Sequence, residues 1–306
     1  MSYLRQFHAA RCKLKTILMK SPEKQNQHKL PQVYMRQFGY EKNGHFKVSV
    51  LKAGEKHTRQ KSIESFLSDT NIFDIESDNP KIVRSFEELN GQFENHYLSM
   101  ISDLDENSEL SEKSFALLLQ FIPNLIARSD QMRDVITELL NSDVKTNFLR
   151  IICAHKAKSF EDLEKQDFYR FMADNAVHNG IINRALLFFT DYLFQRTAHF
   201  DIVIIKSQDG KPWYTTDNPI IFENRMHKFE IMDKDSEVYF PLSPKYLLYL
   251  HFSEADDKEN PLRHLENNKI HIASDEQNIA LQQKIMKNAH QYVIIDGEFK
   301  YKFGVD

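Results

Sequence analysis

The segment from His28 to Arg36 carries three side chains that could act together in acid–base chemistry. His28 precedes an amphipathic stretch that contains Tyr34 and Arg36, so an imidazole, a phenol and a fixed cation lie within three helical turns. A structural role is the alternative, because a histidine at that position can also form hydrogen bonds at the start of a helix. The sequence offers no set of surrounding groups that would make His8, His45 or His57 metal ligands.

A second polar group, the turn TTDNP at residues 215–219, closes a predicted strand and leads into an apolar stretch. Asp217 is a candidate general base or metal ligand there, with Thr216 as a hydroxyl partner and Asn218 as a binding side chain. Aspartate and asparagine also bond the backbone of turns, and proline fixes φ. A rigid strand connection is therefore the alternative.

Asn124 and Arg128 are one helical turn apart, so the two side chains can share a helix face. A guanidinium group suits phosphate or carboxylate, which makes an anion site one interpretation. A solvated surface pair with acidic neighbours such as Asp130 and Asp134 is the other. The sequence lacks a phosphate-binding glycine loop, a nucleophile elbow, a zinc-protease helix and a paired-cysteine cluster, which leaves enzymes whose residues assemble from distant segments.

The elements that must position these residues change in type along the chain. Residues 30–38 are predicted as a short helix that Gly39 ends. The alternating segments 45–51 and 57–61 predict a hairpin, and residues 72–75 predict a further strand.

Helical periodicity then runs from about residue 80 to 197, with Ser111 and Ser159 as predicted N-caps. Strand patterns follow over 201–205, 213–216, 237–240, 246–251, 269–273 and 291–295. Ser274 and Gln277 form a capping-box pattern that starts one long helix among them.

This segregation predicts an α+β fold. It has an N-terminal helix and small β-hairpin region, an all-helical middle, and a C-terminal mixed, mostly antiparallel sheet with one long helix. We expect residues 1–26 to be a basic helix and linker, and residues 27–306 to be a single α+β domain. Within that domain the helical subdomain spans about 80–197 and the sheet about 199–302.

The composition favours a packed cytoplasmic protein, with 41% hydrophobic residues and only 8 Gly and 9 Pro. Cys12 and Cys153 lack the paired spacing of a zinc site or a disulfide framework, which favours a reducing compartment. The longest apolar stretch, residues 181–194, is interrupted by charges and is shorter than the roughly 20 residues of a membrane span. The sequence predicts no membrane span and assigns neither a cofactor nor an oligomeric state.

The charge is unevenly distributed along the chain. Residues 1–61 hold 14 Lys and Arg against 3 Glu, a net charge of +11, whereas the remainder holds 26 against 41, a net charge of −15. Such clustering is typical of a footprint for nucleic acid or another anionic ligand. A basic segment that docks on the acidic remainder is the alternative. We expect residues 1–20, which lack a secretory apolar run, to be an extension rather than a targeting segment.

The segments HKLPQVYMRQF, TTDNPIIF, FPLSPKYLLYL and NAHQYVII together resemble, in the same order, the bacterial domain-of-unknown-function family 4238. The residues that match its pattern are His28, Pro31, Gln32, Phe38, Asp217, Asn218 and Pro219. The departures are Gln37, Thr216 and Asn124, where Asn, Ser and Gln are usual. The resemblance covers roughly residues 27–297. It implies homology, and it implies no activity.

Two classes of function remain open from the sequence. The first is a hydrolase or nuclease-like effector that acts on a nucleotide or nucleic acid, with His28 and Asp217 in one cleft and Arg36 or Arg128 holding the anion. The second is a non-catalytic binding or regulatory module that uses the basic N-terminal region, in a mobile-element or defence context. The further candidate binding residues are Gln32, Tyr34, Asn124 and Asn218.

Overall fold

A short helix and a small group of strands form the N-terminal part of the computed structural model, which describes residues 24–223, 232–253 and 260–299. The elements are β1 (Asn26–His28), α2 (Gln32–Phe38), β2 (Tyr40–Lys42), β3 (His45–Lys52), β4 (Thr58–Ser62) and β5 (Ser68–Thr70). The predicted helix and hairpin are confirmed. The helix predicted for residues 1–20 lies outside the described residues.

Helix α2 forms because its apolar side chains fall on one face, where Tyr34, Met35 and Phe38 are buried. Gly39 ends the helix close to the neighbouring strand. A Cβ atom at this position would lie 2.8 Å from the backbone oxygen of Lys47, so the close packing of α2 on β3 requires glycine there.

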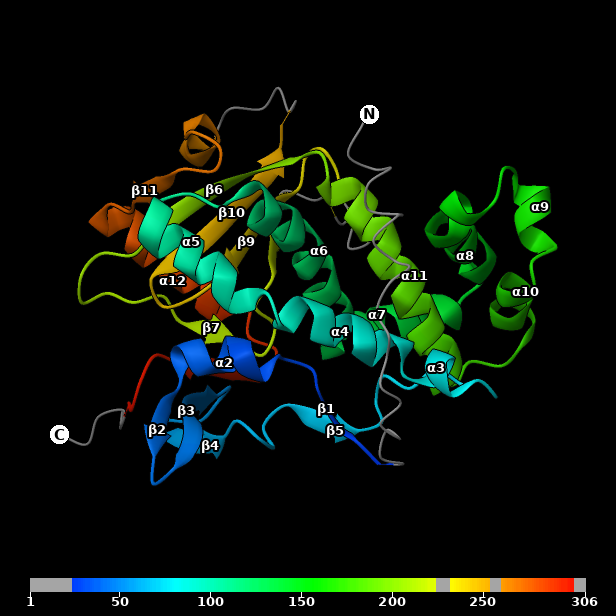
Figure 1. Ribbon diagram of the computed structural model, residues 1–306, viewed down its shortest axis with the longest axis horizontal. Helices are drawn as coiled ribbons and strands as arrows, with labels where there is room; N and C mark the ends of the chain where they lie inside the picture. Colours follow the sequence, from blue (N-terminus) through cyan, green and yellow to red (C-terminus); the bar gives the residue numbers. More distant parts are fainter. Residues whose placement is uncertain (1–23, 224–231, 254–259, 300–306) are drawn as a thin grey trace.

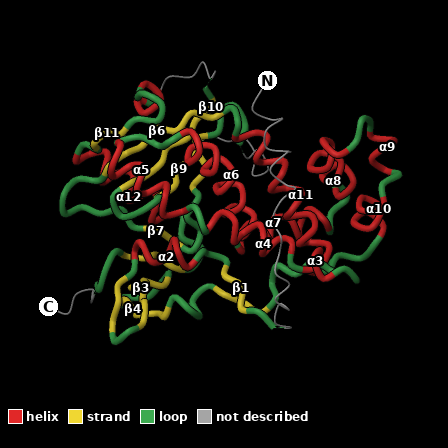
Figure 2. The backbone as a smooth tube through the Cα atoms, in the orientation of Figure 1, coloured by secondary structure: helices red, strands yellow, loops and turns green. Residues whose placement is uncertain are grey.

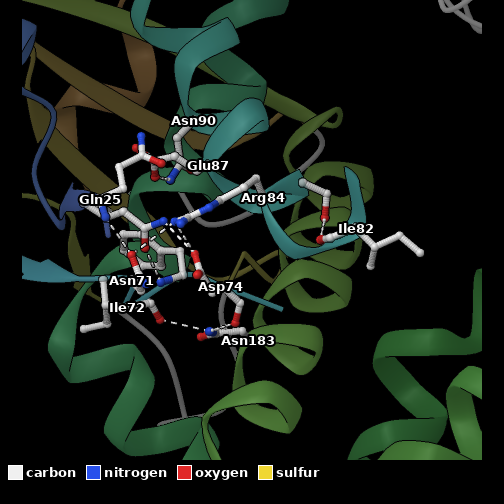
Figure 3. A network of polar contacts seen from close by, with 12 residues as sticks. Gln25, Asn71, Ile72, Asp74, Ile82, Arg84, Glu87, Asn90 and Asn183 are labelled. Atoms are coloured by element: carbon white, nitrogen blue, oxygen red, sulfur yellow. Dashed lines mark hydrogen bonds and ion pairs between the residues drawn. The ribbon is translucent and has the colours of Figure 1, made fainter. Parts of the chain in front are cut away.

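The strand predicted over residues 72–75 is wrong. Residues 68–70 form β5 instead, and β5 pairs antiparallel with β1. The following segment is an irregular turn that side chains from the helical part of the chain hold in place, as Figure 3 shows for Arg84 and Asn183. Arg84 pairs with Asp74 at 2.6 Å, and the Asn183 side-chain amide donates to the carbonyl oxygens of Ile72 (2.9 Å) and Asp74 (2.6 Å). These side chains supply the partners that a strand ladder would otherwise give the backbone.

The middle of the chain is helical, as predicted. Its elements are α3 (Pro80–Val83), α4 (Ser85–Glu94), α5 (Tyr97–Asn107), α6 (Glu112–Arg128), α7 (Asp130–Leu140), α8 (Lys145–Cys153), the 3₁₀ turn η2 (Ala154–Lys156), α9 (Phe160–Glu164), α10 (Asp167–Asp174) and α11 (Asn179–Thr197). The side chains of Ser111 and Ser159 cap α6 and α9, which confirms both predicted caps. Pro123 lies inside α6. In Figure 1, α8, α9 and α10 lie beyond α11, away from the strands.

The last third of the chain supplies most of the strands, which Figure 2 shows gathered on the side opposite α8, α9 and α10. Its elements are β6 (Phe200–Lys206), β7 (Thr215–Thr216), β8 (Ile221–Glu223), β9 (Glu237–Pro241), β10 (Tyr246–Phe252), the 3₁₀ turn η3 (Pro261–His264), β11 (Ile270–Ile272), α12 (Asp275–Lys287) and β12 (Tyr292–Ile295). The capping box of Ser274 and Gln277 at the start of α12 is confirmed.

One sheet has the strand order β11-β6-β10-β9-β8, antiparallel except for the parallel pair β11–β6. The main core covers one of its faces. On the other face, Tyr239 and Tyr249 pack with Leu281 and Ile285 of α12 in a smaller core. Mixed pairing and segregated helices make this an α+β fold.

A buried ion pair lies near one end of this sheet. Arg263 donates to Glu237 at 2.9 Å, and their side chains are only 4% and 2% exposed. Tyr249 and Asn260 also donate to the Glu237 carboxylate, at 2.8 and 2.9 Å. These donors compensate the burial of the carboxylate charge and join η3 to β9.

A second sheet has the order β2-β3-β12-β7, with β4 paired to β3. Strands β7 and β12, which the sequence placed in the C-terminal sheet, therefore join the sheet of the N-terminal hairpin, where β12 pairs with β3 and β7 pairs with β12. Ile294 is fully buried and lies opposite Val50 on one side and Thr215 on the other. Segments from the two ends of the chain thus form one sheet, and the TTDNP turn lies at its edge. None of the helices among the described residues has the length and apolarity needed to cross a bilayer.

Candidate functional site

The carboxylate of Asp217 is held by the backbone that leads into β12. Its Oδ1 accepts a hydrogen bond from the amide of His290 at 2.9 Å, and Oδ2 accepts one from the amide of Gln291 at 2.7 Å. The Asp217 amide donates in turn to the carbonyl oxygen of Tyr292 at 3.0 Å. Burial raises the pKa of Asp217 and outweighs these backbone hydrogen bonds, which act to lower it. The side chain is therefore fixed in orientation and shifted towards protonation.

The other polar residues of the turn keep it rigid. The Thr216 hydroxyl donates to the carbonyl oxygen of Asn218 at 2.7 Å and accepts from its amide at 3.2 Å. The side-chain amide of Asn218 donates to Gln131 of α7 at 2.5 Å, and that of Asn288 donates to the Asn218 carbonyl oxygen at 2.6 Å. Thr216 and Asn218 thus hold the backbone on either side of Asp217.

Tyr34 of α2 lies beneath the same turn and is fully buried. Its hydroxyl is 2.5 Å from the Thr215 hydroxyl and donates to the carbonyl oxygen of Pro241 at 2.9 Å. Burial raises the pKa of Tyr34, so the phenol stays neutral. This contact joins α2, the turn and the C-terminal sheet.

Lys29, the residue after β1, lines the same pocket as Asp217. Its ammonium group pairs with Asp69 at 2.7 Å and with Asp130, at the start of α7, at 2.9 Å. Burial acts to lower the pKa of Lys29, but the hydrogen bonds to both aspartates prevail and raise it. Lys29 is therefore a fixed cation between two carboxylates.

Asp217 and Lys29 line one pocket of about 310 Å³, which we call the Asp217 pocket. Its lining residues are Lys29, Lys61, Ser65, Phe66, Leu67, Ser68, Asp69, Asp130, Asp217, Gln291 and Tyr292. The rings of Phe66 and Tyr292 meet edge to face, with centroids 5.2 Å apart, and form an apolar wall. Leu67 has a positive φ of 53°, an uncommon conformation for a bulky residue and one that often occurs near functional sites.

His28 adjoins the Asp217 pocket without lining it. Its Nε2 lies 3.1 Å from the carbonyl oxygen of Glu64 and 3.3 Å from the Gln32 side-chain amide. Burial lowers the pKa of His28, although the hydrogen bond to Glu64 opposes the shift. No interaction between His28 and Asp217 is present among the described residues. The next residue, Lys29, shares the pocket with Asp217 instead.

The arginine and asparagine candidates lie outside the pocket lining. Arg128 is buried, pairs with Glu94 at 2.9 Å and donates to the backbone oxygen of His28. The Asn124 side chain donates to that of Asn90 at 2.8 Å.

Arg36 lies over the ring of Phe46 at 5.1 Å, and its guanidinium is 3.5 Å from Gln32. Gln32 therefore bridges His28 and Arg36 on the surface of α2. The described contacts of the His28 and Arg36 side chains are with protein groups that do not line the pocket.

Three segments that contain candidate residues from the sequence nevertheless meet around the pocket: the start of α2, the junction of α6 and α7, and the TTDNP turn. Sequence reasoning missed Lys29, Lys61 and Asp130. One signal was present, since Lys29 is next to His28 and Asp130 is two positions after Arg128. The pairing of the hairpin places Lys61 opposite the buried Val48, on the inner side of the sheet.

The arrangement combines the fixed carboxylate of Asp217, two further carboxylates that pair with Lys29, two ammonium groups, hydroxyl groups and an aromatic wall. It can bind a small polar molecule and transfer a proton at Asp217. In the part of the chain that the structure describes, no three or more His, Cys, Asp or Glu side chains are grouped so that they could hold a metal ion.

Comparison with known proteins gives one match. The family model described as "Protein of unknown function (DUF4238)" matches residues 26–298, which include every residue that lines the pocket. No curated protein and no solved structure matches the chain.

Proposed function

Because the chain belongs to the DUF4238 family, whose description names no activity, we propose its function from the Asp217 pocket. The protein is a hydrolase that acts on a phosphate-bearing substrate, either a nucleotide or nucleic acid. Asp217 is its acid–base residue, and Lys61 stabilises negative charge.

The observation that carries the proposal is the raised pKa of Asp217 together with its fixed orientation at the pocket. A carboxylate with a raised pKa, oriented by two backbone amides, faces a polar pocket. A raised pKa makes a carboxylate a stronger base, and a fixed orientation lowers the cost of reaching the reactive geometry. Each oxygen uses one lone pair on an amide and retains another for a water molecule.

The reaction that fits these groups is hydrolysis of a phosphate ester or anhydride. Asp217 accepts a proton from water as the water oxygen forms a bond to phosphorus. The bond from phosphorus to the leaving oxygen breaks, and that oxygen takes up the proton from Asp217 directly or through water. Lys61 stabilises the charge on the phosphoryl oxygens, whereas Lys29 is held by Asp69 and Asp130.

A test compares wild-type protein with Asp217→Asn on ATP, ADP, AMP, NAD and a labelled single-stranded RNA, with product release measured by chromatography. We expect hydrolysis of at least one substrate and a loss of about 100-fold or more in Asp217→Asn. Asp209→Asn is the matched control, because Asp209 is exposed on a turn. Equal rates in the wild type and Asp217→Asn, with both proteins folded, would reject the assignment.

A second function, a nucleic-acid binding module, is favoured by unpaired charge on the hairpin. Lys47, Lys52 and Lys56 have no ion-pair partner among the described residues. By contrast, Lys29 pairs with Asp130 and Lys42 with Glu298 at 2.5 Å, so part of the basic segment docks on later acidic residues. Binding of labelled RNA or DNA that weakens between 50 and 200 mM salt would support this function. Either function suits the cytoplasmic location expected from the sequence.

A further inference from the structure

The size of the Asp217 pocket limits what it can hold. Its volume of about 310 Å³ is at the lower end of the range of roughly 300–1,000 Å³ that small-molecule sites occupy. A single nucleotide is a ligand of this size, whereas a longer strand would have to lie largely outside the pocket.

The pocket lining carries two lysines and three aspartates, Asp69, Asp130 and Asp217. The ammonium group of Lys29 forms ion pairs with Asp69 and Asp130, at 2.7 and 2.9 Å. Lys61 also lines the pocket, and no described residue forms an ion pair with it. A cation on a pocket wall without a carboxylate partner is the group best placed to bind a phosphate.

The aromatic wall supplies a second type of contact. Phe66 is 7% exposed and packs edge to face against the more accessible Tyr292, and both line the pocket. Planar bases bind on aromatic faces largely independently of their identity. Lys61 and this wall thus offer one site for a phosphate and one for a base.

We propose that the Asp217 pocket recognises one nucleotide, with Lys61 binding its phosphate and the wall of Phe66 and Tyr292 contacting its base. This inference rests on the proposed function for the reaction at Asp217, and it names the part of the substrate that is bound. A free nucleotide and a terminal nucleotide of a strand share this chemistry.

Calorimetric titration with AMP, adenosine and inorganic phosphate tests the inference in the full chain. We expect AMP to bind more tightly than either part alone. Lys61→Ala weakens AMP binding at least tenfold and leaves adenosine binding unchanged, whereas Lys61→Arg recovers most of the loss. Tyr292→Ala weakens AMP and adenosine alike and spares phosphate. Lys158→Ala, at an exposed lysine that does not line the pocket, has no effect.

The outcomes separate this inference from the proposed hydrolase. If AMP binds in the Lys61-dependent way and no substrate is hydrolysed, the inference stands and the hydrolase assignment fails. If Asp217-dependent hydrolysis occurs on substrates with no nucleotide, or Lys61→Ala leaves AMP binding unchanged while its melting temperature matches the wild type, the inference is overturned. A labelled RNA with a 5′ phosphate that competes with AMP would identify a strand end as the bound form.

Discussion

Arg128 donates a hydrogen bond to the backbone carbonyl oxygen of His28, although the two residues are 100 positions apart in the chain. The guanidinium is fully buried and also pairs with Glu94. The segments of His28 and Arg128 are separate candidates in the sequence. In the structure, a hydrogen bond from the Arg128 side chain to the His28 main chain joins them. The contact fixes the end of β1, and hence the residue after it, Lys29, at the edge of the Asp217 pocket.

Replacement of Arg128 by methionine should destabilise the fold. The variant leaves Glu94 and the His28 carbonyl oxygen without their donor, and breaking a fully buried pair costs about 3–5 kcal/mol. We expect about 2–4 kcal/mol, because Glu94 remains 27% exposed and water can partly compensate. Urea denaturation measures the change. Arg170→Met, which removes an exposed pair with Asp167, should leave the midpoint unchanged.

The proposed hydrolysis should depend on pH through Asp217. Its pKa in the folded protein lies above the ordinary value of 3.8, so the folded state holds the proton more tightly than the unfolded chain. The stability that this proton gives is present at pH values below 3.8 and is lost as the pH rises through the raised pKa. Hydrolysis needs the ionised form, so kcat/KM should increase over the same range.

The measurement is the pH profile of kcat/KM on the substrate found in the hydrolysis screen. The acid limb should have its midpoint above 3.8 and should disappear in Asp217→Asn. A midpoint at or below 3.8 would show that another group controls this limb.

Tyr34→Phe should lower stability by about 1–3 kcal/mol. The substitution keeps the ring but removes the hydroxyl that contacts Thr215 and Pro241, which leaves buried polar groups without a partner. Thermal denaturation would show the loss. Tyr192→Phe is the control, since the Tyr192 hydroxyl has no hydrogen bond among the described residues. Equal melting temperatures for the wild type and Tyr34→Phe would contradict a supporting role for this hydroxyl.

Arg263→Met should be among the most damaging single changes in the C-terminal sheet. It leaves the carboxylate of Glu237, 2% exposed, without its cation, at a cost of about 3–5 kcal/mol. Lys211→Met breaks a surface pair with Asp275 and should have little effect in the same denaturation experiment. If the double variant Arg263→Met with Glu237→Leu recovers stability, the loss arises from the unpaired charge.

Local patterns in the sequence predicted local structure well. Ser111 and Ser274 start helices as predicted, because a cap depends on residues three positions away. The partners of β12 could not be predicted in this way. Ile294 suits a buried strand in either sheet, and its pairing with Val50 depends on contacts between distant parts of the chain.

Only part of the candidate site could be predicted, because local patterns are visible in the sequence and contacts between distant residues are not. Asp217 was identified because an acid in a dense polar turn is recognisable locally, and the structure places it on a pocket. Lys61 has no distinguishing neighbours, and only the pairing of β3 with β4 turns it inward. The burial of Arg128 was also hidden, since its sequence neighbours include acids that are typical of a solvated helix face.

The central position of β12 has a consequence for synthesis of the protein. Asp217 is anchored by the amides of His290 and Gln291, and Tyr292 forms part of the wall. At about 5–20 residues per second, a ribosome needs roughly 4–15 s to advance from Asp217 to Tyr292. Over that interval the nascent chain has the acid but neither its anchor nor the strand that joins β3 to β7. The pocket therefore forms late in translation, and a chain terminated before β12 lacks it.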